Sequence, residues 1–193
     1  MNRLFYHGMQ PRRSNLCKIR KMIEIIDSGG IKSNRLLGNN LAHGYNGLDY
    51  ISVCSREKIY KYFRKEESAF NLFIKNNFCF ILSGDISVIK PKYLDWKCFK
   101  HYDDLVNYIN SFPDAQFSDL FDEWQVKDEI PLDYVVGLGL PLQSLSKIYN
   151  LDDKMMKEIE RLYMFARTFG WDIVDSDSFF SFYNYEKGKV KNK

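Results

Sequence analysis

Phe78-Cys79-Phe80-Ile81-Leu82 is the stretch that decides the fold, because every side chain in it is apolar. A strand with one face in solvent alternates apolar and polar residues, whereas an unbroken apolar run of this length is typical of a strand buried on both faces. Gly84-Asp85 follows as a bend, and residues 86–89 are expected to continue as a strand. The sequence therefore predicts a sheet with residues 78–82 at its centre.

Shorter strands are predicted on both sides of this run. Upstream, the aromatic segment Leu4-Phe5-Tyr6-His7-Gly8 ends at a glycine, and Tyr50–Ser55 is apolar enough for a second strand. Downstream, Glu123-Trp124-Gln125-Val126 alternates polar and apolar residues, which is typical of a half-buried strand. Residues 130–141 are expected to form a turn and a further strand.

Helices are predicted between these strands from apolar residues at helical spacing. The first is expected to begin at Asn15 as its N-cap and to end at Ser28-Gly29-Gly30, and the last to begin at Asp152 and end at Gly170. Two others are expected over residues 56–76 and 101–112. Separated short strands together with these helices predict the α+β class.

The length of 193 residues indicates a single domain, spanning 1–193. A chain of this size buries about 70% of its extended surface, so it needs neither disulfides nor metals to hold a core. That core is expected over about residues 3–170, followed by a basic, aromatic C-terminal tail over 171–193. No apolar run of membrane-spanning length and no secretory leader is visible, so the predicted compartment is the cytoplasm.

The net charge of +3 is too small to demand a nucleic-acid partner. Its distribution is uneven, because residues 3–35 are rich in Lys and Arg while residues 114–133 are rich in Asp and Glu. Two interpretations remain open. The charges form solvated faces of opposite sign, or a basic N-terminal cleft faces a strand that carries carboxylates.

The cysteines do not form a metal or disulfide framework, since Cys17, Cys54, Cys79 and Cys98 are scattered without a C-x-x-C pair. We expect reduced, structural thiols and no metal site. The sequence also lacks the phosphate-binding loop, the dinucleotide-binding glycine motif, the serine-hydrolase elbow and the zinc-protease motif.

Two residues stand out as candidates for a functional site. His7 ends a predicted strand directly before a glycine, which allows a ligand to approach the backbone closely. Glu123 opens a strand in which Trp124 and Val126 are expected to face the core, so its carboxylate is expected on the other face, beside Gln125. His43, in the Gly- and Asn-rich loop, is interpreted as exposed, and His101, in a charged stretch, is assigned no function.

In combination these segments resemble the ADP-ribosyltransferase superfamily, in its branch of diphtheria toxin and the poly(ADP-ribose) polymerases. Leu4–Gly8 is similar to the first-strand motif L-x-x-H-G, and residues 44–52 resemble the donor loop and second-motif strand. Glu123–Val126, followed by Ile130–Val136, resembles the strand of the catalytic glutamate and the segment after it. The resemblance covers roughly residues 3–140 and is shared with the DNA-modifying branch, but nothing in residues 85–120 matches it.

The resemblance implies a split fold of two small packed sheets flanked by helices, and a catalytic triad of His7, Tyr50 and Glu123. It implies a toxin-like, NAD-dependent mono-ADP-ribosyltransferase that transfers ADP-ribose to a protein or nucleic acid without a metal. Glu123 would stabilise the positive charge that develops on the ribose. His7 would bind the adenosine ribose, and the Gly8 backbone would hold the nicotinamide amide.

Further cofactor contacts follow from the same resemblance. Tyr50 and Tyr60 would stack on the nicotinamide ring. Ser52-Val53-Cys54-Ser55 also resembles the Ser-x-Ser strand of the Arg-Ser-Glu branch, which would give the second motif position to Ser52 instead of Tyr50. Arg12, with Arg13 or Arg35 as alternatives, would bind the pyrophosphate, because one guanidinium group can donate hydrogen bonds to two phosphate oxygens at once.

Two other functions remain open from the sequence. The same NAD site would serve an RNA 2′-phosphotransferase. The basic residues of 3–35 permit this function, but the absence of a second basic motif after Tyr60 in this sequence argues against it. The chain would alternatively be a non-catalytic, NAD-independent binding module in which the triad is coincidental.

Overall fold

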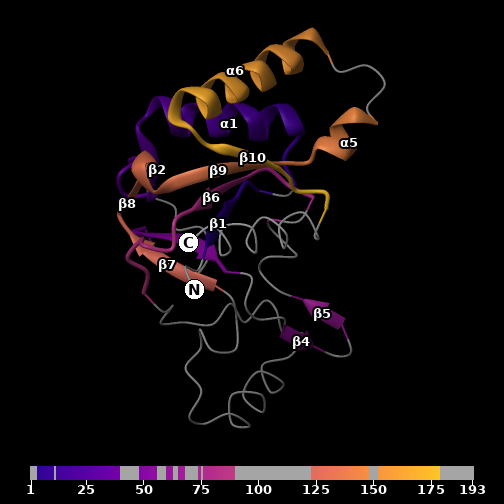
Figure 1. The fold of residues 1–193 in the computed structure, drawn as a ribbon. Helices are drawn as coiled ribbons and strands as arrows, with labels where there is room; N and C mark the ends of the chain where they lie inside the picture. Colours follow the sequence, from indigo (N-terminus) through magenta and orange to yellow (C-terminus); the bar gives the residue numbers. More distant parts are fainter. Residues whose placement is uncertain are drawn as a thin grey trace.

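Six strands form the main sheet of the computed structural model, in the order β10-β9-β6-β1-β3-β7 (Figure 1). Their bounds are Phe5–Gly8 (β1), Tyr50–Cys54 (β3), Cys79–Leu82 (β6), Glu123–Lys127 (β7), Val135–Leu140 (β9) and Asp172–Asp175 (β10). The structure describes residues 4–10, 12–39, 48–55, 60–62, 65–67, 74, 76–89, 123–147 and 152–178. Strands and helices together confirm the predicted α+β class.

The apolar run around residue 80 is a central strand, as predicted. β6 pairs antiparallel with β1 on one side and with β9 on the other. All of its side chains are buried, and Phe80 and Ile81 have no exposed surface. The predicted continuation over residues 86–89 is not a strand; only Ile89 pairs, as an isolated bridge with Gln125. Gly84-Asp85 turns the chain away from β6 before that bridge forms.

The sheet extends beyond the predicted core, which makes the expected boundary at residue 170 wrong. β10 lies parallel to β9, with Asp172 opposite Gly137 and Asp175 opposite Leu140. Parallel neighbours need a crossover, and the helices α5 (Leu142–Ser146) and α6 (Asp153–Phe169) provide it. The short strand was missed because a parallel partner leaves no hairpin signal in the sequence.

Two helices lie side by side over one region of the sheet, α1 (Asn15–Asp27) and α6 (Figure 1). α6 begins and ends as predicted, since the Asp152 carboxylate accepts from Lys154 N at 3.1 Å and Gly170 takes a left-handed conformation. The predicted N-cap of α1 is one residue late. Ser14, not Asn15, caps it by accepting from Cys17 N at 3.3 Å.

The two faces of the sheet carry different cores. The larger core joins α1 and α6 to one face, through side chains such as Ile19, Phe80 and Leu162. The smaller core lies on the other face and consists of Tyr6, Cys54, Ile74, Cys79, Ile81 and Val174. Burial raises the pKa of Cys79 to about 12, so its thiol stays protonated and acts as a small apolar side chain.

The prediction of a helix over residues 56–76 is wrong where the structure describes this segment. Strands β4 (Tyr60–Tyr62) and β5 (Lys65–Glu67) form an antiparallel pair. The register sets Tyr60 opposite Glu67 and Lys61 opposite Glu66. Alternating tyrosines and opposite charges in register favour paired strands over a helix. The predicted helix over residues 101–112 lies outside the described residues.

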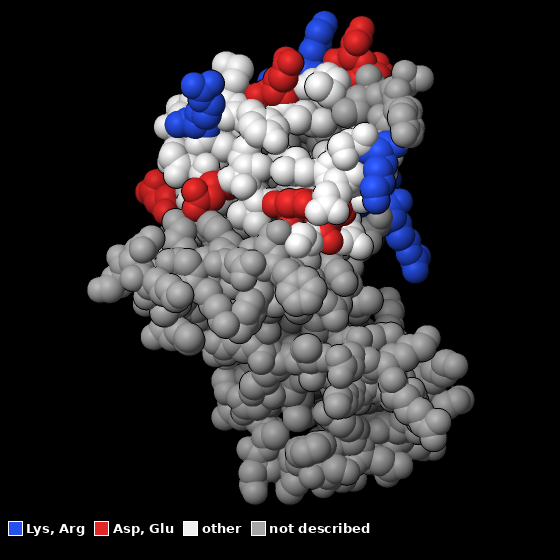
Figure 2. Space-filling model, turned by 45° about the vertical axis from the view of Figure 1, so that its right-hand side comes forward, with Lys and Arg blue, Asp and Glu red and all other residues white. Residues whose placement is uncertain are grey.

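A second sheet pairs β2 (Gly30–Lys32) with β8 (Glu129–Pro131), and a 3₁₀ turn η3 (Leu132–Tyr134) leads from β8 into β9. Charged side chains of the described residues form pairs of opposite sign: Arg20–Glu158, Lys21–Glu24, Lys32–Glu129, Arg35–Asp49 and Arg161–Asp27. Basic and acidic side chains are interspersed on the described surface in Figure 2. This pairing favours solvated faces over a basic cleft for the described part of 3–35.

No helix among the described residues has both the length and the apolar character needed to cross a membrane.

Candidate functional site

The second face of the main sheet changes from apolar to polar between β1 and β3. Residues directly opposite in an antiparallel pair share a face, and the register pairs Tyr50 with Lys127, Ser52 with Gln125 and Cys54 with Glu123. The positions 50, 52, 123, 125 and 127 therefore share one face, which we call the polar half. It lies beside the apolar half formed by the smaller core.

His7, near the end of β1, is held by a hydrogen bond to β3. Its Nδ1 lies 2.8 Å from the carbonyl oxygen of Ser52, and the ring is half-buried. Because a carbonyl oxygen only accepts, Nδ1 carries the proton, and Nε2 of the neutral ring keeps its lone pair. Burial lowers the pKa of His7 below its ordinary value, and the hydrogen bond to Ser52 only partly opposes this. His7 is thus a neutral imidazole that offers an acceptor at Nε2.

The peptide groups of Gly8 are turned toward β3. Met9 donates its N–H to Phe78 O at 2.9 Å, on the β6 side. In a planar trans peptide the Gly8 carbonyl must point the opposite way, toward β3. Alternation along an antiparallel strand turns the Gly8 N–H in the same direction. The ladder between β1 and β3 is recorded at Tyr6–Cys54 and does not extend to Gly8.

His7 and Gly8 together present a compact set of recognition groups. Past the Tyr6–Cys54 pair, the Gly8 N–H and C=O form a donor and an acceptor side by side. The same spacing of donor and acceptor occurs in a primary carboxamide, which can bind an extended residue through two hydrogen bonds. Nε2 of His7 adds an acceptor that suits a hydroxyl group. The arrangement fits a ligand that carries both a carboxamide and hydroxyls.

Glu123 lies on β7, two strands from β1. The register places it in one row with Cys54 and Tyr6, so its backbone is close to that of His7 along the sheet. Alternation assigns position 7 to the opposite face from Tyr6 and Glu123. Convergence of the two groups would thus require the His7 ring to reach toward β3, and the ring does contact the Ser52 carbonyl of that strand. The Glu123 side chain lies outside the described residues, so the predicted convergence stays a prediction.

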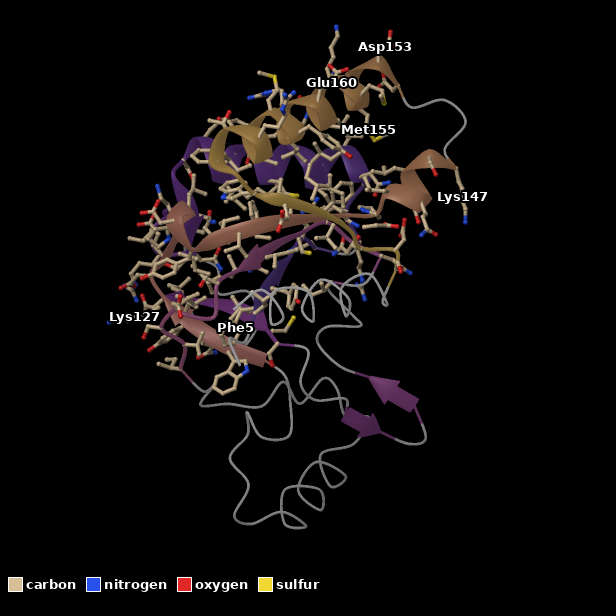
Figure 3. The ribbon with its side chains drawn as sticks, in the orientation of Figure 1. Phe5, Lys127, Lys147, Asp153, Met155 and Glu160 are labelled. Atoms are coloured by element: carbon tan, nitrogen blue, oxygen red, sulfur yellow. The ribbon has the colours of Figure 1, made fainter. Side chains whose placement is uncertain are left out.

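Tyr50 is at the other end of the β3–β7 pairing from Glu123. It pairs with Lys127, the last residue of β7, which is labelled in Figure 3, whereas Glu123 is the first residue of that strand. Ser52 lies between Tyr50 and Cys54, opposite Gln125, and its carbonyl is the one that binds His7. Of the two candidates for the second motif position, Ser52 is the one that the structure brings next to His7.

The remaining predicted contacts are dispersed. Arg35 pairs through two guanidinium nitrogens with the Asp49 carboxylate, and this pairing raises the pKa of Arg35. Its guanidinium is thereby already engaged by an anion, which disfavours Arg35 as the pyrophosphate ligand. Arg12 is exposed, and Arg13 donates to Gln10 at 3.3 Å. For Tyr60 the structure gives only its place in β4, and His43, His101 and Cys98 lie outside the described residues.

Gln125 is a residue of the polar half that the sequence did not single out as functional. It is 4% exposed, and its backbone pairs with Ile89 on the outer side of β7, at 2.8 and 2.9 Å. The alternation Glu123-Trp124-Gln125 places it on the face of Glu123, and that pattern was the available signal. Trp124 lies on the other face, where its ring meets the Phe5 ring edge-on, with the ring centroids 6.1 Å apart.

The part of the chain that the structure describes holds no cluster of three or more His, Cys, Asp or Glu side chains suited to a metal ion. Its cysteines, Cys17, Cys54 and Cys79, form no disulfide with one another.

The lowered pKa of His7 predicts a specific pH dependence of stability. Below about pH 6.5 the unfolded chain protonates this histidine while the folded chain does not. The free energy of unfolding should therefore fall as the pH drops below 6.5, and should level off below the lowered pKa of the folded state. His7→Gln removes this component, so its stability should approach that of the wild type as the pH falls. Urea titrations at several pH values measure the difference; parallel curves would contradict the assignment.

Comparisons with protein-family models, with curated protein sequences and with solved structures found no match to this chain.

Proposed function

We propose that this protein is a NAD-dependent mono-ADP-ribosyltransferase that cleaves the nicotinamide–ribose bond and transfers ADP-ribose to a protein or nucleic acid. The observation that carries the proposal is the edge of β1 at His7 and Gly8. It combines a peptide donor and acceptor turned toward β3 with a neutral imidazole acceptor. NAD carries a carboxamide on its nicotinamide and hydroxyl groups on both riboses, which are the groups that such an edge would bind.

The strand order gives a second line of support. The first motif lies on β1, the two candidates for the second motif lie on β3, and Glu123 lies on β7, and these strands are neighbours in the sheet. His7 and Ser52, 45 residues apart in the chain, are thereby adjacent, as a shared site requires. We propose, as part of the same assignment, that this α+β fold is the split two-sheet fold of the ADP-ribosyltransferases.

The chemistry assigns each group a role. Loss of nicotinamide passes through an oxocarbenium-like state in which positive charge develops on the ribose. The Glu123 carboxylate would stabilise this charge and bind the ribose 2′-hydroxyl. Gly8 would orient the nicotinamide carboxamide, and His7 would accept from a ribose hydroxyl, so both fix the geometry of the reacting bond. Ser52 holds the His7 ring, and Tyr50 or Tyr60 would stack on the nicotinamide.

Binding of NAD is the first test. A saturating ligand that binds only the folded state raises the free energy of unfolding, by about 2.7 kcal/mol at 100 times its dissociation constant. We expect NAD to raise the unfolding temperature by several degrees, and mass spectrometry of the reaction to detect free nicotinamide. ATP, which shares the adenosine but lacks nicotinamide, is the control ligand and should have a much smaller effect.

The same experiment separates the alternatives. An RNA 2′-phosphotransferase would release nicotinamide only when a 2′-phosphorylated RNA is added with NAD. A non-catalytic, NAD-independent module would show neither a thermal shift nor nicotinamide, and that outcome would overturn the proposal.

A further inference from the structure

Asn77 lies in the turn before β6, directly against the end of β1. It is 3% exposed, and its Nδ2 donates to the carbonyl oxygen of Met9 at 2.6 Å. Its backbone N–H donates to Ile74 O at 3.2 Å, which closes the turn. A buried asparagine that spans 68 residues of sequence to reach a backbone carbonyl fixes one segment against another.

Met9 is thereby held on both sides. Its N–H donates to Phe78 O at 2.9 Å, and its carbonyl accepts from Asn77, so two consecutive residues of the turn bind both of its peptide groups. The Met9 N–H shares a peptide plane with the Gly8 carbonyl. The contact of the Met9 N–H with Phe78 therefore sets the direction in which the Gly8 carbonyl points, and Asn77 supports it by fixing the next peptide plane of the same residue through the Met9 carbonyl.

The turn itself is anchored from the far side of the sheet. Asn76, in a left-handed conformation with φ of 56°, donates its N–H to Ser176 O at 2.7 Å. Ser176 in turn donates its N–H to Leu140 O at 2.8 Å, at the ends of β9 and β10. Asn77 is thus attached to a rigid part of the sheet, which is what a residue needs in order to position another group.

We infer that Asn77 is a positioning residue that presents the Gly8 peptide edge to the carboxamide of the ligand. This inference rests on the proposed function, because it concerns the same site. Asn77 binds the Met9 carbonyl through its side-chain amide and is assigned a positioning role, not a catalytic one. Its removal leaves a buried carbonyl without its donor, so the Met9 backbone must shift or admit water. The Gly8 carbonyl would then lose its alignment, whereas the His7–Ser52 contact lies on the other side of β1 and would remain.

Separate binding of two ligand fragments tests this inference. Nicotinamide carries the carboxamide without the riboses, and ADP-ribose carries the riboses without the carboxamide. Calorimetry on Asn77→Ala should give about tenfold weaker binding of nicotinamide, in the range expected for a displaced binding group. Binding of ADP-ribose should change by less than about twofold, well inside one tenfold step.

Ser176→Ala is the matched control. Ser176 is also fully buried in this cluster, but its hydroxyl has no hydrogen-bond partner in the described part of the chain, and its backbone contacts survive the substitution. Both fragments should bind Ser176→Ala as they bind the wild type. Should Asn77→Ala fail to fold, Asn77→Ser replaces it, because serine shortens the side chain while keeping it polar. A separate measurement uses the wild type: the NMR resonance of the Gly8 amide should shift when nicotinamide is added and should not shift when ADP-ribose is added.

The outcomes are distinct. If the wild type binds neither fragment, the proposed function itself fails. If the wild type binds both and Asn77→Ala binds both equally well, Asn77 has no part in carboxamide binding. If Asn77→Ala weakens both fragments by the same factor, its role is general stabilisation, and the inference is overturned.

Discussion

Glu123→Gln is expected to lower NAD cleavage by about two to three orders of magnitude while the protein stays folded. The amide has the shape of the carboxylate but no negative charge, so it cannot stabilise the charge that develops on the ribose. The register places Glu123 on β7, with its backbone opposite that of Cys54. Nicotinamide release under saturating NAD measures the loss, and the circular dichroism spectrum checks the fold.

Glu129→Gln is the control for this substitution. Glu129 lies on β8, half-buried, and its carboxylate is 3.9 Å from the Lys32 ammonium. A pair of this exposure contributes about 0–1 kcal/mol to stability and lies on the second sheet, away from the polar half. Its loss should leave NAD cleavage unchanged. Undiminished cleavage by Glu123→Gln would remove Glu123 from the mechanism, even with NAD binding intact.

The largest effect on stability is expected from Phe80→Ala. Phe80 is fully buried at the centre of the sheet, between His7 of β1 and Leu138 of β9 in register. Truncation of a buried phenylalanine costs about 3–5 kcal/mol, because the lost side chain leaves a cavity that the surrounding strands fill only in part. The free energy of unfolding of an ordinary domain is about 5–15 kcal/mol in total. Urea denaturation should therefore show a much lower midpoint at 25 °C.

Phe169→Ala provides the matched comparison. Phe169 is 47% exposed at the end of α6, and its ring stacks on Trp171 at 4.6 Å and on Phe165 at 6.5 Å. The same chemical change there removes part of a surface stack and leaves no closed cavity, so the expected cost is about 1 kcal/mol. Equal losses from the two substitutions would mean that β6 does not lie at the centre of the core.

The fold was predictable where local sequence carries the signal. Side chains within a few residues of one another were enough to predict three features: the apolar strand at residues 78–82, the N-cap at Asp152 and the left-handed Gly170. β10 and the β4–β5 pair were not predictable in this way. A parallel strand depends on a partner more than thirty residues away, and the tyrosines of β4 occur at spacings that a helix also tolerates.

The candidate site divides along the same line. His7 and Glu123 were found from residue type and position, since a histidine before a glycine and a glutamate opening an amphipathic strand are visible in the chain. The anchoring of Met9 by Asn77 was not visible, because it joins positions 68 residues apart through one side-chain amide. The engagement of Arg35 by Asp49 was equally hidden, and it weighs against a role that residue type alone had suggested.

The sequence by itself determined that this chain forms an α+β fold around one fully apolar strand, because hydrophobic periodicity is a property of neighbouring residues. Only the tertiary structure decided which strands became neighbours, which peptide groups of Gly8 turned toward β3, and which nitrogen of His7 kept its lone pair. Those features depend on hydrogen bonds between distant segments, and such bonds are set by the packing of the whole chain.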